Sequence, residues 1–217
     1  MNQDTFKQID DNKLLALIRT SVPEDSEALI GVLLDGGIRL FEVSVNIPHS
    51  YRLIENLAKK EGVLVGAASV VDGEIAQRAI NAGAKFVASP YTDKDVIYVC
   101  KNNETLVIQS ALTPTEVMDA VRLGVDIVEV YPADLFGGPA YIKALKGPLP
   151  SPKLIPSGGI TPENALEYLK LGVTALVLSD GILEKSLIRA DSWDTIRDRA
   201  KQLVEKVESL KAVKSSQ

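Results

Sequence analysis

The chain has 217 residues, of which 46% are hydrophobic, 5% aromatic and 24% charged, and its formal net charge is −5. This length is normal for one domain, and the core must be built mainly from aliphatic side chains. The acidic balance argues against a nucleic-acid-binding protein, which normally carries a basic patch or stripe. We therefore expect a small molecule, rather than a nucleic acid, as the partner.

The sequence gives no sign of secretion or membrane insertion. Residues 1–12 are polar and acidic, unlike a secretory signal, and the lone Cys100 cannot form an internal disulfide. No apolar run approaches the roughly 20 residues that span a bilayer. We expect a cytoplasmic protein with no membrane role.

Short apolar runs alternate with longer amphipathic stretches from one end of the chain to the other, which is typical of repeated βα units around a parallel sheet. The expected strands cover residues 14–19, 40–46, 64–70, 86–90, 106–111, 127–132, 154–158 and 175–179. Eight is the number of strands that closes a barrel of this type. The sequence predicts a single-domain (β/α)8 TIM barrel over residues 1–217, with a short N-terminal lead and a polar tail at residues 211–217.

Helix boundaries are marked as well. A glycine stands shortly before many of the expected strands, where it can end the preceding helix in the left-handed conformation. The motifs Thr113-Pro114-Thr115-Glu116 and Thr161-Pro162-Glu163 combine a capping threonine, a proline and an early acid, which favours a helix start. Residues 192–210 carry apolar side chains at helical spacing and are predicted to form the closing helix.

Two expected strands carry a glutamate among apolar residues. Strict alternation places Glu42, Ser44 and Asn46 on one face of the second strand, and Glu129 with Tyr131 on one face of the sixth. Both faces are predicted to point into the barrel, near the strand ends where barrel enzymes keep their reactive groups. A buried carboxylate without partners is costly, so each glutamate is either functional, or ion-paired, or able to reach solvent at the mouth.

The loop after the seventh strand is a candidate anion site. Ser157-Gly158-Gly159 precedes an expected helix, where many barrels bind phosphate on free backbone N–H groups. A Gly-Gly turn also serves plain chain geometry, and this alternative stays open. Ser179, at the end of the eighth strand, could contribute a hydroxyl group, whereas the adjacent Asp180 would repel an anion.

At these residues the chain resembles the 2-keto-3-deoxy-6-phosphogluconate and 4-hydroxy-2-oxoglutarate aldolase family along almost its whole length. The resemblance rests on motifs that occur in the same order, among them Phe41-Glu42-Val43-Ser44, Gly66-Ala67-Ala68-Ser69, Tyr131-Pro132-Ala133 and Pro156-Ser157-Gly158-Gly159-Ile160. It implies an aldolase that cleaves a hydroxylated 2-keto acid to pyruvate and an aldehyde, and a homotrimer. In that family a strand-six lysine forms an imine with the substrate and a strand-two glutamate moves protons.

The resemblance assigns roles residue by residue. Glu42 matches the proton-moving glutamate and Arg19 matches a strand-one arginine of the site, while Ser69 and Ser157 stand where the family usually has threonines. Two positions depart from the pattern. Glu129 occupies the position of the imine lysine, and Asn46 the position of an arginine.

Both departures make the site more negative, and glutamate cannot form an imine, because only an amine can condense with the keto carbon. One reading is a lyase with an altered mechanism, through a displaced lysine or through Mg or Mn held by Glu42 and Glu129. A second is a catalytically silent barrel that binds a phosphorylated or acidic metabolite, or acts as a subunit or regulator. A third is an isomerase or epimerase that uses the carboxylate pair.

Overall fold

Eight parallel strands form one continuous sheet in the computed structural model, which describes residues 2–215, with side chains as far as Val213. The strands follow the order β7-β6-β5-β4-β3-β2-β1-β8, and a parallel bridge between Ser157 and Val177 joins the two ends of the sheet into a ring. Their bounds are β1 Leu14–Ile18, β2 Leu40–Ser44, β3 Leu64–Ala68, β4 Phe86–Ser89, β5 Leu106–Ala111, β6 Ile127–Val130, β7 Leu154–Pro156 and β8 Leu176–Leu178. The predicted barrel is confirmed.

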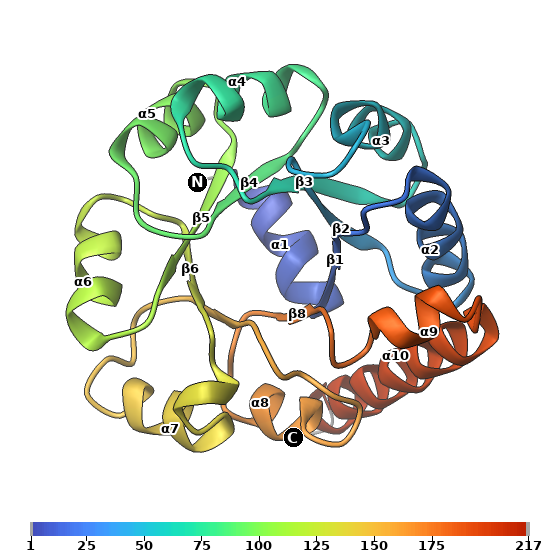
Figure 1. The fold of residues 1–217 in the computed structure, drawn as a ribbon. Coiled ribbons are helices and arrows are strands. Elements are labelled where there is room, and N and C mark those ends of the chain that lie inside the picture. The colour runs from blue at the N-terminus through green and yellow to red at the C-terminus, as the bar shows by residue number, and fades with distance from the viewer. Residues whose placement is uncertain (1, 216–217) are drawn as a thin grey trace.

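Helices surround the ring on its outer side (Figure 1). They are α2 Pro23–Asp35, α3 Ser50–Ala58, α4 Gly73–Asn81, α5 Lys94–Asn102, α6 Pro114–Arg122, η1 Asp134–Phe136, α7 Pro139–Lys146, α8 Ala165–Lys170, α9 Lys185–Arg189 and α10 Trp193–Ser215. No helix in the described part of the chain is long and apolar enough to cross a membrane.

Strand alternation divides the buried apolar side chains into two sets. Leu40 and Ile127 belong to the cluster inside the barrel, whereas Phe41, Val43 and Val128 belong to the larger cluster between the sheet and the helices. The sequence predicts the same assignment of alternate residues to the inner and outer faces of the second and sixth strands. The observed strands are mostly one or two residues shorter than expected at their carboxyl ends, because the chain leaves the sheet there to form the βα loops.

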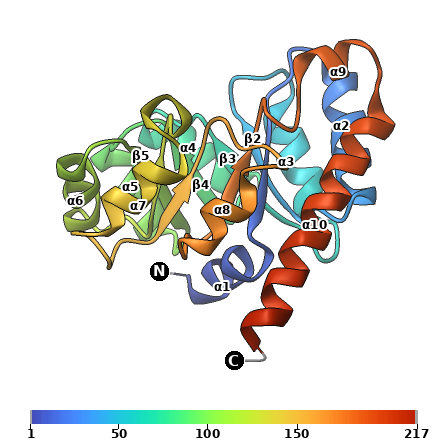
Figure 2. The same cartoon turned by 90° about the horizontal axis from the view of Figure 1, so that it is seen from below.

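The N-terminal lead is a helix, which the sequence reading did not predict. Helix α1, Gln3–Asn12, starts at Asn2, whose side chain accepts a hydrogen bond from the Thr5 backbone N–H. Ile9 is fully buried and Phe6 packs beside it, both against the cluster inside the barrel. Figures 1 and 2 show α1 crossing the opening at the N-terminal ends of the strands. The lead therefore closes this end of the barrel.

The predicted polar tail is also largely helical. Helix α10 continues through Ser215, so residues 211–215 extend the predicted closing helix, and residues 216–217 lie outside the described range. An ion pair between Lys211 and Glu208, 2.6 Å between Nζ and Oε1, spans one turn of this extension. Such pairs add modest support to an exposed helix end.

The two predicted helix starts behave differently. Thr113 and Glu116 form a reciprocal capping box at the start of α6, as predicted. Helix α8 instead begins at Ala165, because the Asn164 side chain accepts the Thr161 backbone N–H at 2.9 Å and holds residues 161–164 in turns.

Candidate active site

A cavity of about 200 Å³ lies at the carboxyl ends of the strands, and every strand or the residue after it contributes to its wall. The lining residues are Leu17, Arg19, Glu42, Ala68, Ser69, Ala88, Ser89, Pro90, Ser110, Glu129, Tyr131, Ser157 and Ser179. Six residues that the sequence singled out for the site are therefore brought together around one space: Arg19, Glu42, Ser69, Glu129, Ser157 and Ser179.

Glu42 lies in the middle of β2 and is only 2% exposed. Its partner in the register is Gly66 of β3, where a side chain would collide with the Phe86 ring at 2.4 Å. The glycine thus lets an aromatic ring pack inside the barrel near Glu42. Burial, and then the negative charge of Glu129, raise the pKa of the Glu42 carboxyl well above its ordinary value, while Arg19 acts in the opposite direction.

Glu129 faces Ser110 across the β5–β6 register, and the Ser110 hydroxyl donates a hydrogen bond to its Oε2 at 2.9 Å. Burial raises the pKa of this carboxyl too, but hydrogen bonds from Ser157 and Ser110 and the charge of Arg19 oppose the rise. These donors favour the ionised form. Both carboxyls therefore hold a proton to higher pH than an exposed glutamate would, and the rise in pKa is larger at Glu42 than at Glu129.

Arg19 and Ser69 complete the polar wall. Arg19 is exposed at the end of β1, and its positive charge favours the ionised form of both glutamates. Ser69 follows β3 with φ at 62°, a left-handed conformation that is uncommon for a residue with a side chain. Its hydroxyl accepts a hydrogen bond from the Ser44 hydroxyl at 3.0 Å. The site thus offers hydroxyl groups, one cation and two coupled acids.

Three residues that the sequence assigned to substrate binding lie outside the cavity wall. Asn46 is exposed in the turn after β2. Gly158 and Gly159 have φ values of 90° and 63°, and a side chain at Gly159 would lie 2.3 Å from the Asp134 Cβ atom. These glycines let the Asp134 side chain pack against the turn, which is the geometric role that the sequence left open. An aspartate in this position disfavours a bound anion at the turn.

Ser110 is a site residue that the sequence analysis missed. It stands on β5 in the same inward phase as Leu106 and Ile108, which belong to the cluster inside the barrel. Alternation on this strand would have found it, since a serine follows two inward apolar residues near the strand's carboxyl end.

Glu42 and Glu129 are the acidic side chains of the cavity wall. Residues 2–215 contain no group of three or more His, Cys, Asp or Glu side chains placed to hold a metal ion. Two carboxylates alone would leave most positions around Mg²⁺ or Mn²⁺ to substrate and water, an arrangement that Mg²⁺ commonly adopts. The cavity wall also contains no lysine.

Comparison with known proteins places the chain in a family. Residues 6–199 match the family described as KDPG and KHG aldolase. The 2-dehydro-3-deoxy-phosphogluconate aldolase of Treponema pallidum is 32% identical over 165 residues, which cover 76% of this chain and 79% of that protein. The corresponding enzyme of Pseudomonas aeruginosa is 26% identical over 195 residues, covering 89% of both chains.

Solved structures agree with this match. The KDPG aldolase of Legionella pneumophila, solved with pyruvate captured as a covalent carbinolamine intermediate, has a TM-score of 0.81 at 25% identity, covering 92% of this chain and 97% of that one. A native KDPGal structure has a TM-score of 0.79 at 26% identity, covering 90% and 94% of the two chains. Fold, length and sequence agree over most of the molecule, so the chain belongs to the KDPG and KHG aldolase family.

Proposed function

We propose that the protein is a carbon–carbon lyase that cleaves a 4-hydroxy-2-keto acid to pyruvate and an aldehyde, and that Glu42 and Glu129 carry the reaction without an imine. The family and its curated aldolases support the reaction type. The observation that carries the mechanism is that Glu42, which is buried, and Glu129, which accepts a hydrogen bond from Ser110, line one cavity at the barrel mouth.

The pair supplies both a base and an acid. The Glu129 carboxylate takes the proton of the substrate's 4-hydroxyl group, and the electrons of that O–H bond form the aldehyde carbonyl. The bond between C3 and C4 breaks, its electrons form the C2–C3 double bond of an enol, and the keto oxygen takes the proton of Glu42. Glu129 then gives its proton to C3 of the enol while Glu42 takes back the enol O–H proton, which yields pyruvate and restores both side chains. Proton transfer by placed side chains contributes about 10²- to 10⁴-fold to a rate.

The cavity's composition supports this route over an imine. The family resemblance gives position 129 to the imine-forming lysine, and this chain has a glutamate there. An imine requires an amine within reach of the keto carbon, and no lysine lines the cavity in the described structure.

Arg19 is the cationic side chain in the cavity wall and is proposed to hold the substrate carboxylate. A guanidinium group suits this task because it can bind a carboxylate through two parallel hydrogen bonds. Ser69, Ser157 and Ser179 offer hydroxyl groups for the keto and hydroxyl oxygens of the substrate. In an alternative route, both glutamates in their ionised form would hold a divalent cation, which would polarise the keto group in place of the Glu42 proton.

The test is pyruvate release from 2-keto-3-deoxy-6-phosphogluconate and from 4-hydroxy-2-oxoglutarate, with and without Mg²⁺ or Mn²⁺. Glu42→Gln and Glu129→Gln should each lower kcat by about 10²- to 10⁴-fold, since each removes one proton-transfer group. Glu61→Gln, which changes an exposed glutamate outside the site, is the matched control.

Binding of these acids without pyruvate release would instead favour a silent binding protein. Conversion to an isomer without cleavage would favour the isomerase reading. The resemblance also leads us to propose a homotrimer in the cytoplasm, and light scattering on the purified protein would test the trimer.

A further inference from the structure

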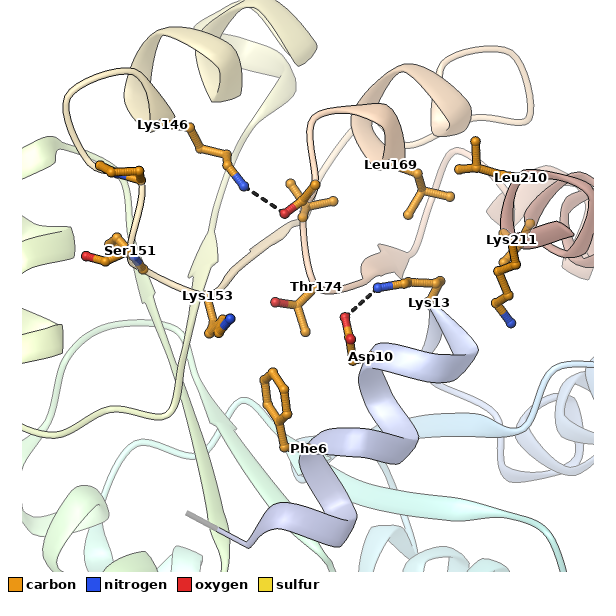
Figure 3. A pocket seen from close by; sticks show the side chains of 15 residues that line it. Phe6, Asp10, Lys13, Lys146, Ser151, Lys153, Leu169, Thr174, Leu210 and Lys211 are labelled. Atoms are coloured by element: carbon orange, nitrogen blue, oxygen red, sulfur yellow. Dashed lines mark hydrogen bonds and ion pairs between the residues drawn. The ribbon is translucent and has the colours of Figure 1, made fainter. Parts of the chain in front are cut away.

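A second cavity, of about 210 Å³, lies far from the glutamate pair, beside helix α1 at the end of the barrel that this helix closes. Figure 3 shows its wall, which brings together α1, the loops before β7 and β8, and helix α10. None of its lining residues belongs to the cavity at the barrel mouth.

The charge of this cavity is opposite to that of the whole chain. Four lysines line it, Lys13, Lys146, Lys153 and Lys211, against one acid, Asp10. Asp10 forms an ion pair with Lys13, so its charge is already engaged. Lys211 is likewise paired with Glu208, so Lys146 and Lys153 give the wall its excess of positive charge in a chain whose net charge is −5. Such a local reversal of sign concentrates anions.

Neither Lys146 nor Lys153 forms an ion pair within the described residues. The Lys146 ammonium group donates to the Gly172 carbonyl oxygen at 2.7 Å, and the Lys153 ammonium group lies 5.8 Å from the centre of the Phe6 ring. Burial, and then the positive charge of Lys153, lower the pKa of Lys146. Like charges brought together in this way repel each other, and a bound anion would relieve the repulsion.

The rest of the wall suits a molecule that has a carbon skeleton as well as charge. Phe6, Leu169 and Leu210 offer apolar surface, and the buried Thr174 lies among the lysines (Figure 3). The volume is below the roughly 300 to 1,000 Å³ of a typical drug-sized site, which favours a small metabolite over a nucleotide.

We propose that this basic cavity, formed by Lys13, Lys146, Lys153 and Lys211 with Phe6 and Thr174, binds a small phosphorylated organic acid. The phosphate and carboxylate groups contact the lysine ammonium groups, and the carbon skeleton lies against Phe6. The site is separate from the barrel mouth and does not depend on the reaction proposed there.

Isothermal titration calorimetry with 3-phosphoglycerate as the probe, and glycerate as its unphosphorylated counterpart, tests the proposal. The probe should bind more tightly than glycerate, and the double variant Lys146→Gln with Lys153→Gln should weaken its binding by about tenfold or more, because each charge-assisted contact is strong. Lys94→Gln, an exposed lysine on α5, is the control and should leave the affinity unchanged. Arg19→Gln removes the carboxylate-binding group of the barrel mouth, and binding of the probe to the basic cavity should persist in this variant.

Lys153→Gln alone is the second variant, because Lys153 is exposed and its replacement removes no hydrogen bond within the fold. Far-UV circular dichroism checks that each variant is folded. The proposal is overturned if the probe does not bind at millimolar concentration, if it binds no better than glycerate, or if Arg19→Gln abolishes binding while the lysine variants leave it intact.

Discussion

Burial and two neighbouring charges set the pKa of the Glu42 carboxyl. Burial raises its pKa most, Glu129 raises it further, and Arg19 lowers it. Glu129 differs because Ser157 and Ser110 donate to its carboxylate. Two identical side chains thus receive different tasks from their neighbours, and pairs whose environments differ in this way commonly divide the acid and base roles.

Strand alternation alone predicted that both glutamates point into the barrel. Successive residues of a strand point to opposite faces, so once the neighbouring apolar residues are assigned to the outer face, the glutamates must lie on the inner one. It could not predict that Asn46, Gly158 and Gly159 lie outside the cavity wall. Those residues stand beyond the strand ends, where loop geometry and the packing of Asp134 decide their positions.

The raised pKa of Glu42 predicts how stability varies with pH. The folded state binds the proton more tightly than the unfolded state, so the stabilisation is complete below the ordinary value of 4.5 and is lost as pH rises through the raised pKa. Between these two pKa values, the Glu42 carboxyl lowers the free energy of unfolding by up to about 1.4 kcal/mol per pH unit. Glu42→Gln should therefore make the free energy of unfolding less dependent on pH in this range. Urea unfolding from pH 5 to pH 9 measures it, with Glu61→Gln as the control. Parallel curves for the wild type and Glu42→Gln would contradict the assignment.

The lysine and the arginine that the family resemblance implies can be restored by two substitutions. Glu129→Lys combined with Asn46→Arg should form a covalent pyruvate adduct at position 129, because burial and a nearby arginine both lower an amine pKa toward neutrality. Glu42 would oppose part of this shift. The gain in rate is expected to be small, since a misplacement of about 1 Å can cost about a hundredfold. Borohydride reduction and peptide mass spectrometry detect the adduct. A folded double variant that binds pyruvate without forming it would argue against this position as the imine site.

At the scale of elements, the strands and the closing helix over residues 192–210 were predictable, whereas helix α1 and the helical residues 211–215 were not. Each strand carries enough apolar residues to show its period, whereas α1 buries few residues, among them Thr5 and Ile9, within a polar and acidic sequence. Helix α1 is stabilised by its position against the open end of the barrel rather than by a periodic pattern of apolar residues in its own sequence. Tertiary packing of this kind stabilises short helices more than their propensity does.

This role of α1 can be measured. Ile9→Ala should lower the free energy of unfolding by about 2 to 5 kcal/mol, because Ile9 is fully buried against the cluster inside the barrel. Gln8→Ala, on the exposed side of the same helix, should change it by less than about 0.5 kcal/mol. Chemical denaturation gives both values. Equal effects of the two substitutions would show that α1 does not close the barrel as a structural element.

At the scale of the molecule, the two ends of the barrel differ in character. The mouth gathers two coupled acids and a single arginine, and the opposite end gathers lysines beside α1. The fold is that of an aldolase family, but a fold does not determine chemistry, which depends on the residues of the site. In this chain those residues include Glu42 and Glu129, which we propose as an acid–base pair.

The most direct test of an imine-free reaction is to incubate the protein with pyruvate and borohydride and then assay pyruvate release. We expect activity to survive and intact-mass spectrometry to find no added pyruvyl group, because no lysine lines the cavity. Loss of activity together with a reduced adduct on a lysine would contradict it. Lys185 is the residue to inspect first, because it borders a small hollow that shares Leu17, Arg19 and Ser179 with the cavity at the barrel mouth.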